Sequence, residues 1–358
     1  MGEARRKALL NVADALEANE KFILAENAKD VAAAEKTDLP KATLQRLVLK
    51  PGKIAQLARG CRTLAESPDP IGRVLRRTRV AEGLNLEQVA APLGVLLIIF
   101  EARPDAMPQI AALALASGNG LLLKGGKEAV RSNAAIHATI VGAVAEAGLS
   151  TDLIGLVTTR DEIADLLKLD HLIDLVIPRG SGALVRHIQN NTRIPVLGHA
   201  DGVCHVYVDK DADVAKVLKI VVDSKIDYPA ACNAVETVLL HGNTMRSVMT
   251  PQGMDKGIFH KTKEALVQAG VTMHGGPKYR EWCCSEEAKQ EGIAKASELS
   301  APPALKHEYG DLGVTIELVD SMEEAIDYIH ANGSGHTDAI ITENPEAAAK
   351  FLSTVDSA

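Results

Sequence analysis

The stretch GVLLIIF, residues 94–100, decides the fold class because every position after its glycine is apolar. A strand that is apolar at successive positions must be covered on both faces, as in a parallel sheet flanked by crossover helices. Further short apolar runs follow at 121–123, 153–157, 172–177 and 203–208, with helical stretches between them. The pattern predicts an α/β fold in which these runs form a parallel sheet.

A second group of apolar runs follows residue 230 and alternates with helical stretches in the same way. It predicts a second α/β unit, which agrees with a length of 358 residues, since domains usually hold roughly 100–200 residues. We place the domains at 1–227 and 228–358. The expected strands are 235–240, 313–319 and 338–342, and the expected helices are about 256–268 and 321–331.

Two segments before the first sheet have patterns of their own. Residues 5–33 place apolar side chains at helical spacing, which predicts a helical opening. Residues 72–93 alternate apolar and charged positions around Glu82-Gly83, which predicts two amphipathic strands joined by a turn. Such a ribbon has no local partner surface, so we expect it to pair across the subunits of a homo-oligomer.

The composition argues against several classes of protein. With 46% hydrophobic and 24% charged residues, the chain is typical of a soluble globular protein. A net charge of -8 argues against nucleic-acid binding, because the phosphates of a nucleic acid need a basic surface. The longest apolar run is far short of the ~20 residues that span a bilayer, and the amino terminus lacks the apolar core of a signal peptide. We therefore expect a cytoplasmic protein that binds no membrane.

The first motif that could carry chemistry is GNGLLLKGGK, residues 118–127. A strand that enters a glycine turn before a helix beginning near Glu128 presents backbone amides to a phosphate, and Lys124 at the strand end adds a positive charge. The motif is not a P-loop, because five residues instead of four separate Gly120 from Gly126 and Glu128 replaces the required Ser or Thr. The alternative is an ordinary turn with solvated lysines.

The second motif is IPRGSGALV, residues 177–185, which is again a strand, a glycine turn and a helix. Gly180 and Gly182 give only part of the GxGxxG dinucleotide fingerprint, because the third glycine is absent. A phosphate-binding loop and a helix start capped by Ser181 are about equally supported by these residues.

The third motif is DYPAACNA, residues 227–234. Cys232 follows Pro229 in a loop and is preceded by small alanines. It lies at the predicted boundary between the first α/β unit and the second. A thiolate there could attack an activated acyl carbon, with the backbone amide of Cys232 helping to hold the oxyanion. The alternative is an inert packed thiol. Five cysteines without CxxC spacing favour neither disulfides nor a metal site, and the other four are expected to be structural: Cys61, Cys204, Cys283 and Cys284.

The fourth motif is HANGSGHT, residues 330–337. A helix that ends at Asn332-Gly333 explains the asparagine and the glycine as a cap. It leaves His336 and Thr337 unexplained.

Taken in this order, the motifs resemble the gamma-glutamyl phosphate reductase family of the aldehyde dehydrogenase superfamily, and the resemblance covers essentially the whole chain. It is carried by the segments GVLLIIFEARPDAMPQIAALALASGNGLLLKGGKEAVRSN, IDLVIPRGS, PVLGHADGVCHVYVD, DYPAACNAVETVLLH and HEYGDLG. These segments are close to the reductase half of eukaryotic, plant-like pyrroline-5-carboxylate synthetase. In that enzyme a glutamate 5-kinase module is fused to the reductase.

The resemblance implies that NADPH reduces L-glutamyl 5-phosphate to glutamate 5-semialdehyde, with release of phosphate, in proline biosynthesis. It implies that Cys232 is the nucleophile, that residues 1–227 bind NADPH and that residues 228–358 form the catalytic domain. The implied cofactor contacts are Lys124 at the adenine ribose with Gly125 beside it, Gly180 and Ser181 at the pyrophosphate, and Glu308 at the nicotinamide ribose. The candidate substrate contacts are Arg103, Asn233, His336 and Thr337.

Several positions depart from the family or superfamily pattern. Val196 replaces the glutamate that activates water in hydrolytic aldehyde dehydrogenases, so we expect the thioester to react with hydride or phosphate instead of water. The superfamily's oxyanion asparagine is not evident near Arg103, and Tyr328 stands where relatives have histidine. Relatives also continue beyond Ala358, so we expect a truncated catalytic domain with poor activity, and an organellar location if a targeting or kinase segment is missing. The alternatives are another semialdehyde dehydrogenase and an inactive, regulatory or oligomerising module.

Overall fold

The structure, a computed structural model, describes residues 1–37, 39, 41–158, 162–180, 182–199, 201–245, 248–250, 253–255, 257–285 and 299–357. It consists of two compact units, Met1–Ala200 and Asp201–Ala358, and each is described by itself. Each unit contains a parallel sheet, which confirms the α/β fold. The observed boundary lies earlier than residue 227, because the strand and helix that follow residue 203 pair and pack within the second unit.

The sheet of the first unit has the strand order β5-β4-β3-β6, and all of its strands are parallel. The apolar run that opened the sequence argument forms β3, between β4 on one side and β6 on the other. The chain thus adds β4 and β5 on one side of β3 and then crosses to add β6 on the other. The strands are β3 (Val95–Phe100), β4 (Gly120–Gly125), β5 (Ile154–Val157) and β6 (Leu175–Arg179).

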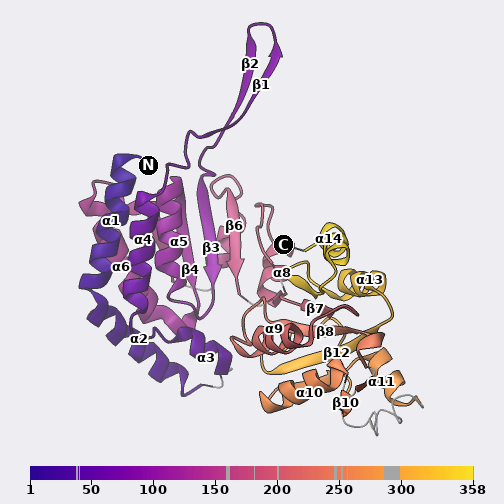
Figure 1. The fold of residues 1–358 in the computed structure, drawn as a ribbon. Coiled ribbons are helices and arrows are strands. Elements are labelled where there is room, and N and C mark those ends of the chain that lie inside the picture. The colour runs from indigo at the N-terminus through magenta and orange to yellow at the C-terminus, as the bar shows by residue number, and fades with distance from the viewer. Residues whose placement is uncertain are drawn as a thin grey trace. The chain divides into compact units, whose positions relative to one another are not determined.

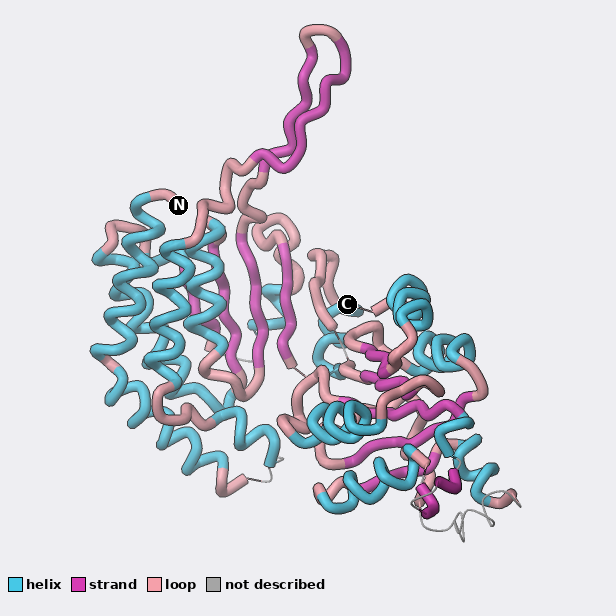
Figure 2. The backbone as a smooth tube through the Cα atoms, in the orientation of Figure 1, coloured by secondary structure: helices cyan, strands magenta, loops and turns pink. Residues whose placement is uncertain are grey.

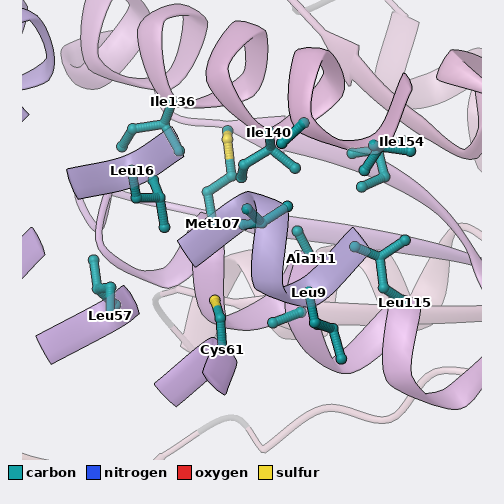
Figure 3. Close-up of a cluster of buried hydrophobic side chains, with 14 of the residues drawn as sticks. Leu9, Leu16, Leu57, Cys61, Met107, Ala111, Leu115, Ile136, Ile140 and Ile154 are labelled. Atoms are coloured by element: carbon teal, nitrogen blue, oxygen red, sulfur yellow. The ribbon is translucent and has the colours of Figure 1, made fainter. Parts of the chain in front are cut away.

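Helices cover both faces of this sheet, as the two-sided apolar pattern of β3 requires. On one face Leu96 and Ile98 meet the larger core, which Figure 3 shows in close-up. On the other face Leu97 and Ile99 form a smaller cluster with residues near β6 and α8. The helices of the larger face are α1 (Glu3–Ala18), α2 (Glu20–Ala34), α4 (Lys53–Glu66), α5 (Ala106–Ser117) and α6 (Val130–Glu146); the remaining helices are α3 (Lys41–Leu47), α7 (Glu162–Leu166) and α8 (Gly182–Asn190).

A two-stranded ribbon projects from the first unit (Figure 1). Its antiparallel strands are β1 (Val74–Ala81) and β2 (Leu84–Val89), and nearly all of their residues are exposed. Gly83 has a φ of 75° in the turn between them, a left-handed conformation that favours glycine. The prediction of two strands and a turn is confirmed, and most of the apolar side chains of the ribbon are exposed.

The sheet of the second unit has the strand order β11-β12-β8-β7-β13, and its strands are also parallel. Figure 2 shows the strands of both units in magenta. The run at 203–208 forms β7 of this sheet and not part of the first one. The three later strands and the two later helices predicted from the sequence are confirmed. The strands are β7 (Cys204–Val208), β8 (Val235–His241), β11 (Thr272–Gly275), β12 (Gly313–Val319) and β13 (Asp338–Ile341).

Two separate clusters of buried side chains cover the faces of the second sheet. Val238 and Leu240 of β8 pack in one cluster, and Leu239 packs in the other. A minor hairpin, β9 (Val248–Thr250) with β10 (Gly253–Asp255), lies outside the main sheet. No helix in the described ranges is both long and apolar enough to cross a membrane. The helices are α9 (Val214–Ile226), α10 (Ile258–Gln268), α11 (Pro277–Cys283), α13 (Met322–Asn332) and α14 (Pro345–Thr354).

Candidate active site

The carboxyl edge of the first sheet gathers the residues expected to bind the cofactor. Phe100, the last residue of β3, pairs with Gly125 of β4 and with Arg179 of β6, so the loops after these three strands start at one level. Because the strand order reverses between β3 and β6, the crevice at their carboxyl ends is the place where open α/β sheets bind ligands. This edge therefore has the topology of a dinucleotide site.

Lys124 lies next to last in β4, opposite Ile99 of β3. Strand alternation places it with Leu122 on the sheet face whose cluster includes residues of α7 and α8. Only 8% of Lys124 is exposed, and its ammonium donates to the carbonyl of Gly125 at 2.7 Å. The helix expected near Glu128 starts with a short 3₁₀ turn at Lys127–Ala129 and continues as α6.

The second glycine turn lies at the same edge, between β6 and α8. Gly180 is exposed and lies two residues before Gly182, where α8 starts, while Ser181 between them lies outside the described residues. The first amides of α8 have no intrahelical partner, and an anion is the ligand that such a helix end prefers. This turn and Lys124 therefore share one edge of the sheet.

Arg103 lies in the loop after β3, at this same edge, and is half-buried. The preceding residue, Ala102, is buried and has a φ of 45°, and its amide donates to the carboxylate of Glu128. A left-handed φ at a residue other than glycine is strained, and such strain is often found at functional sites. Arg103 belongs to the first unit, whereas the other expected substrate contacts belong to the second.

Cys232 lies in a loop between α9 and β8, and its side chain is exposed. Two successive turns shape this loop, because the amide of Ala231 donates to Tyr228 and that of Ala234 donates to Ala231. The amides of Cys232 and Asn233, between these bonds, donate to no acceptor among the described residues. An exposed thiol beside two free amides can form a covalent acyl bond and stabilise the oxyanion that develops.

The other cysteines lack this combination. Cys61 and Cys204 are buried, and burial raises the pKa of the Cys61 thiol to about 11 and that of Cys204 to about 12. Both therefore stay protonated at neutral pH and are poor nucleophiles. Cys283 is buried, while Cys284 is exposed. Burial thus agrees with a structural role for three of the four.

Two residues that touch Cys232 were not identified from the sequence. The thiol of Cys204 donates to the carbonyl of Cys232 at 3.2 Å. Gly202 packs so closely that a Cβ there would lie 2.2 Å from the same carbonyl oxygen. Only glycine fits this position without moving the backbone of the cysteine loop. No local motif indicated this role, since Gly202 and Cys232 lie 30 residues apart.

Glu308 lies in the same unit as Cys232, and Gly202 contacts both residues. Its Oε2 accepts a hydrogen bond from the amide of Gly202 at 3.1 Å, and its side chain is otherwise exposed. Gly202 therefore contacts both the carbonyl of Cys232 and the carboxylate expected to meet the nicotinamide ribose. The sequence predicted Glu308 and Cys232 separately, and the structure brings their loops together.

His336 and Thr337 lie in the loop that leads into β13, and their side chains hydrogen-bond each other at 2.7 Å. The backbone of Thr337 contacts the thiol of Cys204, which itself contacts Cys232. The strand pairing explains this arrangement, since Cys204 pairs with Val235 and His205 pairs with Asp338. The loops before β7, β8, β12 and β13 thus form one site at the amino edge of the second sheet.

Two of the departures from the family pattern have packed, apolar surroundings. Val196 is half-buried beside the smaller core cluster of the first unit and forms a bridge with Val176. Tyr328 is packed beside the cluster around Tyr207, edge-on to His205. Among the residues that the structure describes, no group of His, Cys, Asp or Glu side chains could hold a metal ion.

The chain is similar to known proteins in sequence and in fold. The model of the aldehyde dehydrogenase family matches residues 2–251. The chain is 53% identical over 356 residues to delta-1-pyrroline-5-carboxylate synthase 1 of Oryza sativa subsp. japonica, covering 99% of this chain and 46% of that protein. It is 45% identical over 356 residues to gamma-glutamyl phosphate reductase of Synechococcus sp. (strain RCC307), covering 99% of this chain and 75% of that protein.

A solved structure is similar along nearly the whole chain. The crystal structure of gamma-glutamyl phosphate reductase from Thermotoga maritima superposes with a TM-score of 0.85 at 30% identity, and the match covers 99% of this chain and 81% of that chain. The chain spans about half the length of the curated plant relatives that it matches. On its sequence and its fold, the chain belongs to the gamma-glutamyl phosphate reductase branch of the aldehyde dehydrogenase family.

Proposed function

We propose that this chain catalyses the NADPH-dependent reduction of L-glutamyl 5-phosphate to L-glutamate 5-semialdehyde and phosphate, a step of proline biosynthesis. The observation that carries the proposal is Cys232, an exposed thiol in a turn whose two neighbouring amides lack partners among the described residues. Relatives that carry the name gamma-glutamyl phosphate reductase support the choice of substrate.

The Cys232 thiolate attacks the 5-carbonyl carbon of the acyl phosphate, after its thiol proton is lost. The free amides of Cys232 and Asn233 stabilise the negative charge on the carbonyl oxygen. The C–O bond to phosphate then breaks, phosphate leaves with the electron pair, and a thioester remains on Cys232. When the thioester carbon has accepted a hydride, the C–S bond breaks, the aldehyde is released and the thiolate is restored.

A bound dinucleotide would supply that hydride, and residues of the first unit would hold it. We assign the adenine ribose to Lys124 and Gly125, and the pyrophosphate to the turn that contains Gly180 and Ser181. The ammonium of Lys127, exposed three residues after Lys124, supports NADPH over NADH because it can pair with the extra phosphate. In the second unit Glu308 would accept hydrogen bonds from the nicotinamide ribose.

Val196 supports reduction over hydrolysis. Its side chain is apolar and half-buried, and it cannot remove a proton from water as the glutamate of hydrolytic relatives does. The thioester on Cys232 would therefore last long enough to be reduced. We assign substrate contacts to Arg103, Asn233, His336 and Thr337.

The reverse reaction gives the most direct test. Phosphate-dependent reduction of NADP by glutamate 5-semialdehyde is measured for the chain itself, for a version extended at its carboxyl end with the corresponding part of a longer relative, and for Cys232→Ala in each. Activity that is lost with Cys232→Ala supports the proposal. A silent wild type in both lengths, or full activity without the thiol, would refute it.

The exposed β1–β2 ribbon supports a second, separate proposal of self-association. Its apolar side chains at Leu75, Leu84 and Leu86 are 52–63% exposed, which is costly for a monomer in water. Sedimentation of the intact chain and of a deletion of 74–90 tests this. We expect a homo-oligomer that becomes a monomer after the deletion, and a monomer in both cases would remove the proposal. Coupling to a glutamate 5-kinase module and a cytoplasmic location remain predictions.

A further inference from the structure

A fully buried ion pair contacts the loop that carries Cys232. Lys225, in the last turn of α9, and Glu236, on β8, have side chains that are 0% exposed. The Nζ of Lys225 donates to Oε2 of Glu236 at 2.8 Å and to the carbonyl of Val235 at 2.9 Å. Since Val235 is the third residue after Cys232, the ammonium holds the point where the cysteine loop enters its strand.

The same pair contacts the loop that carries Glu308. Oε1 of Glu236 accepts from the amide of Gly310 at 3.5 Å. The ammonium of Lys225 lies 5.7 Å from the centre of the Tyr309 ring, within the range of a cation–π contact. The hydroxyl of Tyr309 hydrogen-bonds Thr315 of β12 at 2.8 Å, which ties this loop to the sheet.

The contacts form a closed ring. Glu308 accepts from the amide of Gly202 at 3.1 Å, and Gly202 packs against the carbonyl of Cys232. From Cys232 the chain runs to Val235 and Glu236, which lead back through the ion pair to the Glu308 loop. One side of the ring is made of two exposed candidate residues, and the other side is the buried pair.

The energetics of buried charges argue that this pair does more than stabilise the fold. Two charges removed from water cost several kcal/mol each, and apolar residues of similar volume are often as stable or more stable in their place. A fully buried pair is therefore weak evidence for a role in stability alone. Here the hydrogen bonds that it makes outside itself go to the start of β8 and to the Glu308 loop.

We propose that Lys225 and Glu236 are positioning residues, which fix the Glu308 loop relative to the Cys232 loop and so set where the dinucleotide ribose lies with respect to the thiol. The inference rests on the proposed function, in which Glu308 meets the nicotinamide ribose and Cys232 carries the acyl group. Neither residue of the pair touches substrate or cofactor; both act through the backbone of the two loops.

Hydrogen exchange tests the positioning without relying on catalysis. In Lys225→Met/Glu236→Leu, the apolar pair preserves the volume, and we expect the amides of Gly202 and Gly310 to exchange about tenfold faster or more while those of β8 and β12 keep their rates. The exposed pair Lys216–Glu343 of the same unit provides a matched control, Lys216→Met/Glu343→Leu, with no change in these amides. Unchanged exchange at Gly202 and Gly310, or equal acceleration throughout the unit, would overturn the proposal.

A double-mutant cycle tests the link to Glu308. In the wild-type background, Glu236→Gln should raise KM for NADPH about tenfold, with a smaller change in kcat. In a Glu308→Gln background the same substitution should raise KM for NADPH by less than about twofold, because the effects of residues that act through one another are not additive. Additive effects would mean that Glu236 does not act through Glu308. If the wild type shows no reductase activity, the proposed function fails, and the exchange measurement still decides whether the pair positions the loops.

Discussion

The two sheets of this protein present their candidate residues at opposite ends of their strands. In the first unit Lys124, Gly125 and Gly180 lie at the carboxyl edge, where the next helices begin. In the second unit Cys232 and Glu308 lie in loops before β8 and β12, at the amino edge. Helix amino termini offer free amides and a positive dipole to phosphates, so the first edge suits a dinucleotide.

Within the described residues, the amino edge of the second sheet has no such helix ends to stabilise negative charge. The helices that precede its loops, α9 and α13, end there at Ile226 and Asn332 and offer carbonyl groups instead. Negative charge on a thiolate or an oxyanion must then be stabilised by turn amides and held in place by contacts between loops. The proposed binding at the first edge therefore follows from the sheet topology, whereas the proposed chemistry at the second edge depends on particular contacts.

Loss of the thiol should have the largest effect, because the second edge would lose its only covalent chemistry in the proposal. We expect Cys232→Ala to lower kcat by about 10³-fold or more with little change in dinucleotide affinity, since positioned binding groups alone give only residual rates. The assay is phosphate-dependent NADP reduction, with dinucleotide binding followed separately by fluorescence. Cys284→Ala removes the other exposed thiol of this unit and should leave the rate unchanged. An equal loss in both variants would contradict the assignment.

A methyl group at Gly202 should have the next largest effect. Its Cβ would lie 2.2 Å from the carbonyl oxygen of Cys232, so either backbone must move. We expect Gly202→Ala to lower kcat/KM by about 100-fold and to destabilise the second unit by about 1–3 kcal/mol, as overpacking does. Gly242→Ala is the matched control, because its Cβ would meet only ordinary contacts at 3.8 and 3.9 Å. Normal kinetics for Gly202→Ala would show that the thiol does not depend on this contact.

Most of the strands could be predicted from the sequence because a short run that is apolar at successive positions indicates a buried strand whichever sheet it joins. It could not predict which sheet a run joins, since the run at 203–208 is as apolar as those of the first sheet and pairs with β8 instead. For the same reason the domain boundary predicted from the apolar runs lies at residue 227, whereas the structure divides the chain after Ala200. Pairing partners are set by contacts between distant segments, which one sequence does not display.

The candidates Lys124 and Cys232 could be singled out from the sequence because a local motif surrounds each of them. Gly202 carries no motif, and its need for glycine arises from a backbone that is 30 residues away in the chain. The pair Lys225 and Glu236 reads from sequence as two ordinary charged residues, because burial is a property of the folded unit. Contacts between loops therefore account for what the sequence left out.

At the first edge, removal of a charge should weaken binding and spare the chemistry. We expect Lys124→Met to raise KM for NADPH about tenfold, equivalent to about 1.4 kcal/mol, with kcat reduced by less than about threefold. Lys168 provides the control, since it precedes β6 and so lies toward the amino edge of the same sheet. Lys168→Met should leave KM unchanged. A fall in kcat without a change in KM would contradict the proposal that the first edge binds the dinucleotide and the second edge carries the chemistry.

The smallest expected effect is a change in how stability depends on pH at the second edge. Burial raises the pKa of Glu236 to about 7 from 4.5, although Lys225 and the amides of Tyr309 and Gly310 oppose the shift. Between these two values the folded state binds more protons than the unfolded state. The free energy of unfolding should therefore fall as pH rises from about 4.5 to about 7, by at most about 1.4 kcal/mol per pH unit from this group.

Glu236→Gln cannot titrate, so its stability should lack this part of the slope. The free energy of unfolding of the second unit is measured for both proteins by urea titration between pH 4.5 and pH 8. The fluorescence of Trp282, which lies in this unit, reports the unfolding. Lys124→Met at the first edge serves as a reference, because its free energy of unfolding should depend on pH in the same way as that of the wild type across this range. If Glu236→Gln and the wild type lose stability in parallel, the carboxyl group is already ionised in the folded protein at low pH. The amino edge would then be held by a permanent ion pair and not by one that forms as the pH rises.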